Sequence, residues 1–88
     1  MYTVYVLRSQ KDAFLYTGFT SNLEKRLQSH NAGKVRSTKG RRPLLLVYYE
    51  VYEDKTTARK RELFLKCGQG RKFLKEILKS KDKKSFAH

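Results

Sequence analysis

Five side chains are of types that could take part in the hydrolysis of a phosphodiester: Tyr5, Tyr16, Arg26, His30 and Glu62. That reaction requires an oriented, deprotonated water, a clamp on the charged phosphoryl oxygens, and a strand held in line with the attack. Tyrosine and histidine can orient or deprotonate the water, arginine can bind the phosphate, and a carboxylate can bind a cation. Whether these residues act together depends on where the fold places them.

Arg26 and His30 are four residues apart on a predicted helix, so their side chains share one face. A guanidinium binds two phosphoryl oxygens in a planar fork and stays charged, which makes Arg26 the candidate phosphate clamp. The alternative for Arg26 is ordinary surface charge. His30 has two interpretations: it assists the base or contacts the phosphate, or it is a charged residue that the dipole at the helix C-terminus stabilises.

Glu62 lies on a predicted helix line with Ala58 and Leu65, where its neighbours are small or apolar. A lone carboxylate on such a line is costly to bury without a partner. A divalent cation is one partner, and Mg²⁺ (or Mn²⁺) suits a site with one carboxylate, several waters and a substrate phosphate. The alternative is a salt bridge to Arg26, Arg59 or a neighbouring lysine. On these residues alone, both interpretations of Glu62 stay open.

Tyr5 and Tyr16 lie on two predicted strands, where either hydroxyl can orient or deprotonate the attacking water. A tyrosine that acts as a base needs its ordinary pKa of about 10 lowered. Arg26, His30 or the metal would lower it. Tyr16 is the favoured base of the two, and half-buried packing is the alternative interpretation for each.

The elements that position the first four side chains follow from the hydrophobic pattern. Residues 2–8 and 14–18 predict the two strands of a hairpin, with Gly18 at its end. Ser21 and Glu24 form a Ser-x-x-Glu capping box for a helix that runs to about residue 31, and Gly33 stops it. Residues 44–52 carry the strongest strand signal and are expected to be the central strand.

Two further helices follow in the C-terminal half. Thr56 or Thr57 is expected to cap a helix that ends near Cys67, and residues 71–79 predict the last helix. Residues 1–79 would form the domain, and residues 80–88 a basic, disordered tail. The order strand, strand, helix, strand, helix, helix predicts an α/β fold, with a small three-stranded, mainly antiparallel sheet flanked by helices.

The net charge of +13 is extreme for 88 residues and is unevenly distributed. Residues 33–42 hold five Lys or Arg and no acid, and residues 59–88 hold eleven. Such clustering predicts a polyanion partner, most simply nucleic acid, although a generally soluble basic surface is the alternative. The predicted nucleic-acid contacts are Thr38, Lys39, Arg41 and Arg42 in the loop and Lys72 on the last helix, with Lys75 extending the track.

Composition also excludes several classes of protein. The single cysteine, Cys67, excludes an intrachain disulfide and a cysteine-rich zinc site, and it fits a reducing compartment. No apolar run reaches the roughly 18 residues of a membrane span. Residues 2–7 begin a strand where a secretion signal would need a basic start and a longer apolar stretch. We therefore expect a cytoplasmic, nucleoid-associated protein.

These motifs together resemble the signature of the GIY-YIG nuclease superfamily. Thr-Val-Tyr at residues 3–5 and Tyr-Thr-Gly at residues 16–18 stand where the family has its two tyrosine motifs. Arg26 follows Gly18 by eight residues, and Glu62 comes later on a helix, as in the family. The similarity covers about residues 2–78. It is closest to small single-domain bacterial members and to the N-terminal nuclease domain of UvrC-type excinucleases.

The resemblance implies a Mg²⁺-dependent endonuclease that cuts DNA, with Glu62 as the metal ligand and branched or damaged DNA as the expected substrate. Larger members carry extra domains that choose the target, so here a protein partner, DNA shape or the basic loop would supply specificity. Two alternatives stay open. One is a non-catalytic nucleic-acid-binding module, suggested by the lack of the family's usual asparagine in residues 72–78. The other is a small RNA-associated or ribosome-associated basic protein.

Overall fold

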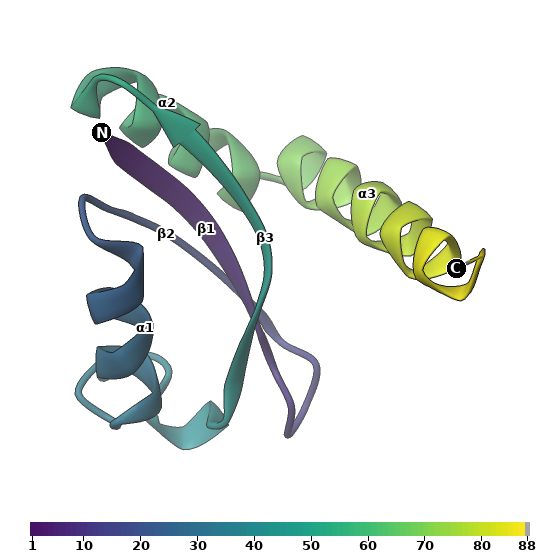
Figure 1. The fold of residues 1–88 in the computed structure, drawn as a ribbon, viewed down its shortest axis with the longest axis horizontal. Helices are drawn as coiled ribbons and strands as arrows, with labels where there is room; N and C mark the ends of the chain where they lie inside the picture. The colour runs from purple at the N-terminus through teal and green to yellow at the C-terminus, as the bar shows by residue number, and fades with distance from the viewer. Residues whose placement is uncertain (88) are drawn as a thin grey trace.

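The computed structural model describes the backbone of residues 1–87 and the side chains of residues 1–79 (Figure 1). Its elements are β1 (Tyr2–Ser9), β2 (Leu15–Thr20), α1 (Leu23–Asn31), the short 3-10 helix η1 (Lys39–Arg41), β3 (Leu44–Tyr52), α2 (Lys55–Lys66) and α3 (Gly68–Ala87). The order of strands and α-helices confirms the predicted α/β fold. Within the described part of the chain, no helix combines the length and apolar character of a membrane span.

The three strands form one antiparallel sheet in the order β2-β1-β3. The prediction that residues 44–52 are central is therefore wrong, because β1 lies in the middle and its residues Val4 to Leu7 are all buried. β3 is an edge strand that alternates between half-buried and exposed positions over much of its length. Its apolar composition resembled that of a central strand, although Tyr49 and Val51 remain 56% and 49% exposed.

The sheet carries a different hydrophobic cluster on each face, because successive residues of a strand point to opposite sides. On one face Tyr5, Leu7 and Leu44 pack with Tyr16 and with residues of α1. On the other face β1 packs against α2 and α3; the buried members there are Val4, Val6, Ala58, Leu65 and Leu74. α1 is thus separated by the sheet from α2 and α3.

Asn31, the last residue of α1, fixes this helix to the start of β3. Its side-chain amide donates to the carbonyl of Leu44 at 3.1 Å and accepts from the backbone N–H of Leu44 at 2.8 Å. The Asn31 amide thus makes the two hydrogen bonds to the Leu44 backbone that a neighbouring strand would otherwise make. Because His30 directly precedes Asn31, the same pairing holds His30 against the sheet.

Both helices are capped by residues close to the predicted ones. α1 is capped by Asn22, whose side chain accepts from the backbone N–H of Lys25 at 3.1 Å, and the capping box at Ser21 does not form. α2 is capped by Asp54, which accepts from the backbone N–H of Thr57 at 2.8 Å. Asn and Asp are at least as favourable at this position as Ser and Thr.

α2 and α3 meet closely at Gly70, which lies inside α3. A Cβ at Gly70 would come within 1.9 Å of the carbonyl oxygen of Phe64, so glycine is required for this contact. Gly68 and Gly70 lie in the first turn of α3, whereas the sequence predicted that the last helix begins only at residue 71. Cys67 is exposed at this junction.

The last helix is longer than predicted, since α3 starts at Gly68 and its backbone continues to Ala87. The predicted end at residue 79 therefore falls within it. Residue 88 and the side chains of residues 80–88 lie outside what the structure describes, and the division into a domain and a tail remains a prediction.

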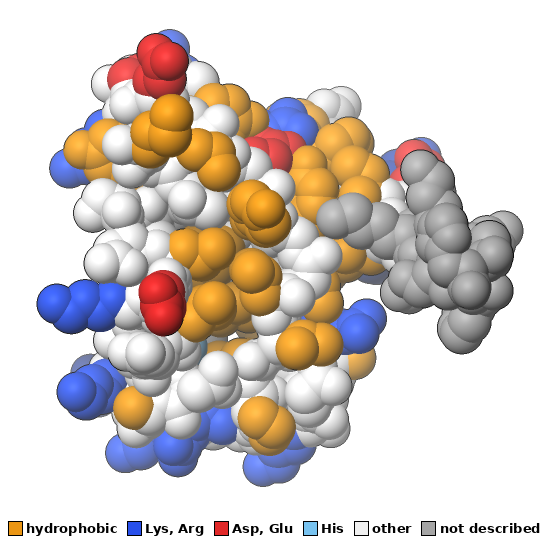
Figure 2. Space-filling view, in the orientation of Figure 1, with side chains coloured by type: hydrophobic (Ala, Val, Ile, Leu, Met, Phe, Trp, Pro, Cys, Tyr) orange, Lys and Arg blue, Asp and Glu red, His pale blue; other side chains and the backbone are white. Residues whose placement is uncertain are grey.

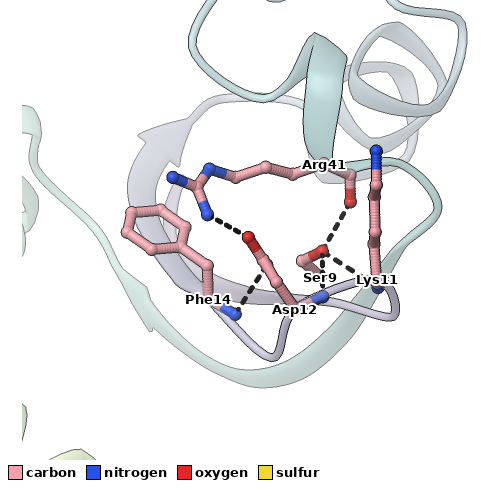
Figure 3. Close-up of polar contacts among 5 residues, drawn as sticks. All are labelled: Ser9, Lys11, Asp12, Phe14 and Arg41. Carbon is pink, nitrogen blue, oxygen red and sulfur yellow. Dashed lines mark hydrogen bonds and ion pairs between the residues drawn. The ribbon is translucent and has the colours of Figure 1, made fainter.

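A clamp formed by Ser9, Asp12 and Arg41 joins the β1–β2 hairpin to the loop before β3 (Figure 3). The Ser9 hydroxyl donates to the carbonyl of Arg41 at 2.7 Å and accepts from the backbone N–H of Lys11 at 3.1 Å. The Arg41 guanidinium pairs with Asp12 and lies 3.9 Å from the centre of the Phe14 ring. Arg41 is thus engaged in holding the fold together.

Candidate active site

Tyr5, His30 and Thr38 form a buried chain of hydrogen bonds between β1, α1 and the basic loop. Tyr5 Oη lies 3.0 Å from His30 Nε2, and His30 Nδ1 lies 2.8 Å from Thr38 Oγ1. The three residues are 1%, 0% and 0% exposed. Arg26 Nε donates to the Tyr5 hydroxyl at 3.3 Å, which extends the chain to a half-buried guanidinium. Three of the five predicted residues, Tyr5, Arg26 and His30, are therefore joined by hydrogen bonds.

The protons of this chain can be assigned in one consistent direction. The Thr38 hydroxyl has an acceptor in the carbonyl of Val35 at 3.4 Å, so its oxygen can accept from His30 Nδ1–H. His30 Nε2 then carries a lone pair and accepts from the Tyr5 hydroxyl, whose oxygen accepts from Arg26. Every hydroxyl proton has an acceptor in this assignment, which makes His30 a neutral imidazole with its proton on Nδ1.

Electrostatics support the neutral imidazole. Burial, with a smaller contribution from the charge of Arg26, lowers the pKa of His30 to about 4. The interpretation of His30 as a charged residue stabilised by the helix dipole is therefore wrong. Burial also raises the pKa of Tyr5, and the hydrogen bond from Arg26 opposes this without reversing it. Arg26 therefore lowers the pKa of Tyr5 as expected, but burial outweighs this effect, so the net pKa of Tyr5 is raised.

Tyr16 lies beside this chain and is more accessible than Tyr5. Its ring meets His30 edge-on, with centroids 5.0 Å apart, and its centroid is 6.4 Å from that of Tyr5. Tyr16 also interacts with the guanidinium of Arg26. Tyr16 is only half-buried, whereas Tyr5 is 1% exposed. A ligand that approaches from solvent would therefore reach Tyr16 and Arg26 before Tyr5.

Gly18 makes room for the Tyr5 ring. The two residues are directly paired across β1 and β2. A Cβ at Gly18 would lie 2.6 Å from Tyr5 Oη and 2.8 Å from its Cζ, which is too close for any other residue without a shift of the ring. The sequence suggested that Gly18 ends the strand, but β2 continues to Thr20. A glycine inside a strand often marks such a close approach.

Glu62 is buried on α2, at 8% exposure, and its carboxylate lies 3.1 Å from the ammonium of Lys66. The basic partner that we considered as an alternative is thus Lys66, one helical turn away, and not Arg26 or Arg59. The alternative of a neighbouring lysine is thus confirmed, at the four-residue spacing that brings two side chains of a helix together. Burial dominates the raised pKa of Tyr5, but the charge of Glu62 adds to it, so Glu62 acts electrostatically on the tyrosine site.

The donor set at Glu62 fits a hydrated cation. Among the described residues, no group of three or more His, Cys, Asp or Glu side chains could hold a metal ion. A cation at Glu62 would therefore complete its coordination mainly with water and substrate oxygens. Mg²⁺ is bound in this way at many phosphate sites, through one or two carboxylates.

Thr38 does not belong to the surface track for which it was predicted, because it is buried and bonded to His30. Lys39 is exposed, and Arg42 Nε donates to the Lys39 carbonyl at 3.0 Å. Lys39, Arg42 and Lys11 line an open depression of about 590 Å³. Figure 2 shows Lys and Arg side chains gathered along the edge of the molecule that carries α1 and this loop.

Lys72 is exposed on α3, together with Lys75. Because α3 packs on the face of the sheet opposite Tyr5, these lysines do not extend the track from the loop. The predicted nucleic-acid residues therefore divide between two sides of the molecule.

Comparison with known proteins agrees with this arrangement. Residues 1–75 match the GIY-YIG catalytic domain. A UPF0213 protein of Clostridium perfringens is 50% identical over 64 residues, which cover 72% of this chain and 68% of that protein. One from Staphylococcus haemolyticus is 45% identical over 75 residues, covering 84% and 90%. The solution structure of a UPF0213 protein from Bacillus halodurans has a TM-score of 0.54 at 30% identity, over 88% of this chain and 85% of that one. The chain therefore belongs to the GIY-YIG family.

Proposed function

We propose that this protein is a divalent-metal-dependent endonuclease that hydrolyses phosphodiester bonds in DNA. Membership of the GIY-YIG family implies a nuclease and a nucleic-acid substrate. The observation that carries the proposal is the buried chain from Thr38 through His30 and Tyr5 to Arg26, which holds a guanidinium beside Tyr16. Such a fixed cation at a partly open site suits a phosphate whose charge grows during reaction.

Arg26 is the phosphate clamp in this proposal. A guanidinium has five N–H donors, and Tyr5 engages the one on Nε. Its remaining donors bind oxygens of the scissile phosphate and stabilise the charge that develops on them. Tyr5 is a positioning residue, because its buried hydroxyl is already engaged with Arg26 and His30.

Tyr16 orients the attacking water. This assignment rests on its partial exposure and on its place beside Arg26, and it keeps the tyrosine that the sequence favours. The water then meets the phosphate that Arg26 holds, so that nucleophile and target are positioned by adjacent side chains.

Glu62 would hold Mg²⁺ or Mn²⁺. When bound, the cation would neutralise charge on the phosphoryl and leaving oxygens. Lys66 already pairs with the Glu62 carboxylate, so the affinity of the site depends on the competition between this ammonium and the cation.

The DNA would lie over the open part of the Tyr5 face, where β3 exposes Tyr49 and Val51, and along Lys39 and Arg42. Loop cations of this kind bind phosphates without reading sequence. We propose that the target is branched or damaged DNA, as in repair, and that DNA shape or a protein partner selects it.

The purified protein should be incubated with labelled duplex, single-stranded, flapped and four-way-junction DNA in Mg²⁺, Mn²⁺ or EDTA. Cutting of at least one DNA in a divalent cation, and none in EDTA, is the expected result. Cutting that persists in EDTA would overturn the metal requirement.

A second candidate is a binding module that keeps the fold without catalysis. The Glu62–Lys66 ion pair favours it, because the one predicted metal ligand already has a basic partner. Such a module would bind DNA equally in EDTA, would weaken steeply with salt, and would cut no DNA in the same panel.

A further inference from the structure

A second cavity, of about 430 Å³, lies between the β1–β2 hairpin and α3. Phe14, Leu15 and Leu78 contribute apolar surface to it. Four basic residues also line it: Arg8, Arg71, Lys75 and Lys79. None of these residues belongs to the Tyr5 site, and none of the described residues 1–79 that line the cavity is a carboxylate.

The sheet separates this cavity from the candidate active site. On β1, Leu7 packs on the Tyr5 face, and the next residue, Arg8, lines the cavity. On β2, Tyr16 lies on the Tyr5 face, and its neighbour Leu15 lines the cavity. Because neighbouring residues of a strand point to opposite faces, a ligand in the cavity is not the phosphate that Arg26 holds.

The positive charge at this cavity favours an anionic ligand. Among residues 1–79, no carboxylate forms an ion pair with Arg8, Arg71, Lys75 or Lys79. Arg71, Lys75 and Lys79 are exposed and succeed one another at four-residue spacing along α3, so they lie along one side of the helix. A row of this kind suits a ligand with repeated negative charges.

The apolar lining indicates that the ligand also carries an apolar or aromatic group. Phe14 is held in place by the Arg41 guanidinium, which lies 3.9 Å from its ring centre and is itself paired with Asp12 (Figure 3). An aromatic ring fixed beside cations is the arrangement on which bases of single-stranded nucleic acids stack. The volume falls within the range of about 300–1,000 Å³ typical of small-ligand sites, which suits about one nucleotide.

We propose that this cavity binds a segment of single-stranded nucleic acid, with a base against Phe14 and its phosphates on the basic row of α3. The binding itself does not depend on cleavage. A consequence that rests on the proposed function is that the protein holds two segments of one substrate, one on each face of the sheet. Flapped or branched DNA has a single-stranded arm beside a duplex, so it could bind at the candidate active site and in the cavity at the same time.

The test is fluorescence anisotropy with a labelled oligothymidylate in EDTA, at several salt concentrations. The cavity variant is Arg71→Glu with Lys75→Glu. Its matched control is Lys55→Glu with Lys60→Glu, which makes the same charge change at exposed positions of α2 that do not line the cavity. If two phosphate contacts are lost, the salt slope of the affinity falls by about 1.4 in the cavity variant and the affinity falls roughly tenfold. The control should keep the wild-type slope.

A Phe14→Leu variant isolates the stacking, since it keeps an apolar side chain and all charges. It should weaken oligothymidylate binding by roughly fivefold or more, and Phe14→Tyr should restore it. Equal loss of affinity in the cavity and control variants would mean that only net charge matters and would overturn the proposal. So would an equal loss for a blunt duplex, because the cavity would then not distinguish a single strand.

These readouts separate the two proposals. Cavity-dependent binding by a protein that cuts no DNA supports this inference and contradicts the nuclease assignment. A protein that cuts DNA, but whose cavity variants bind single strands as well as the wild type, supports the nuclease assignment and contradicts this inference.

Discussion

Thr38 Oγ1 lies 2.8 Å from His30 Nδ1, and neither residue is exposed to solvent. This contact joins the basic loop to α1 at the point where His30 also meets Tyr5. It occupies the one ring nitrogen that Tyr5 does not use, and so determines which nitrogen carries the proton. The orientation of Tyr5, and through it that of Arg26, depends on this arrangement.

Replacing Thr38 with valine should leave His30 Nδ1–H without a partner in a buried site. We expect the free energy of unfolding to fall by about 1–3 kcal/mol, which is typical for an unpaired buried polar group. Thr38→Ser keeps the hydroxyl and should retain most of the stability. Denaturant unfolding measures both values, and ¹⁵N NMR of the His30 ring reports the tautomer. Equal stability and equal ring shifts in the two variants would contradict the role of this hydroxyl.

The low pKa of His30 makes the fold sensitive to acid. Since the pKa falls from 6.5 in the unfolded chain to about 4 in the folded protein, the unfolded state binds more protons between these values. His30 therefore contributes its full stabilisation above pH 6.5, and the free energy of unfolding decreases as the pH falls toward 4. His30 should contribute roughly 3 kcal/mol to this decrease. Denaturant unfolding of a His30→Gln variant should show a weaker dependence over the same range, and an unchanged slope would argue against it.

The hairpin turn contains a removable strain. Ala13 has a φ of 62°, in the left-handed region that favours glycine. Ala13→Gly should raise the free energy of unfolding by about 0.5–1 kcal/mol. Ala32→Gly is the matched control, because Ala32 has a φ of −82° and should lose stability on the same change. Thermal unfolding of the pair tests this, and a destabilised Ala13→Gly protein is the contrary result.

The sequence was sufficient for the element order and for the local contacts of the site, since strands and helices follow from periodicity and Arg26 and His30 from their spacing. It did not identify what depends on distant pairing. The role of Thr38 arises because the loop folds back on α1, and a basic loop suggested surface contacts instead. Gly18 could be understood only once β1 was paired with β2. The edge position of β3 depends on which strand β1 joins, and its apolar composition carries no such information.

Lys66 should compete with a cation at Glu62. Lys66→Met keeps much of the apolar stem and removes the ammonium 3.1 Å from the carboxylate. We expect it to raise the affinity for Mn²⁺, measured by electron paramagnetic resonance on the protein without DNA. Glu62→Gln should abolish the binding, and Lys60→Met, on the same helix, should leave it unchanged. An affinity that Lys66→Met does not alter would show that the ammonium does not compete.

The nuclease assignment is tested most directly by measuring cleavage and binding of one labelled flapped DNA side by side. Glu62→Gln and Arg26→Ala would be compared with the wild type and with Lys60→Ala as a surface control. We expect Mg²⁺-dependent cutting by the wild type and the control, a loss of about 100-fold or more in the other two, and binding within a few-fold in all four. A wild type that binds equally in EDTA and never cuts, or a Glu62→Gln variant that cuts as well as the wild type, would contradict the nuclease assignment.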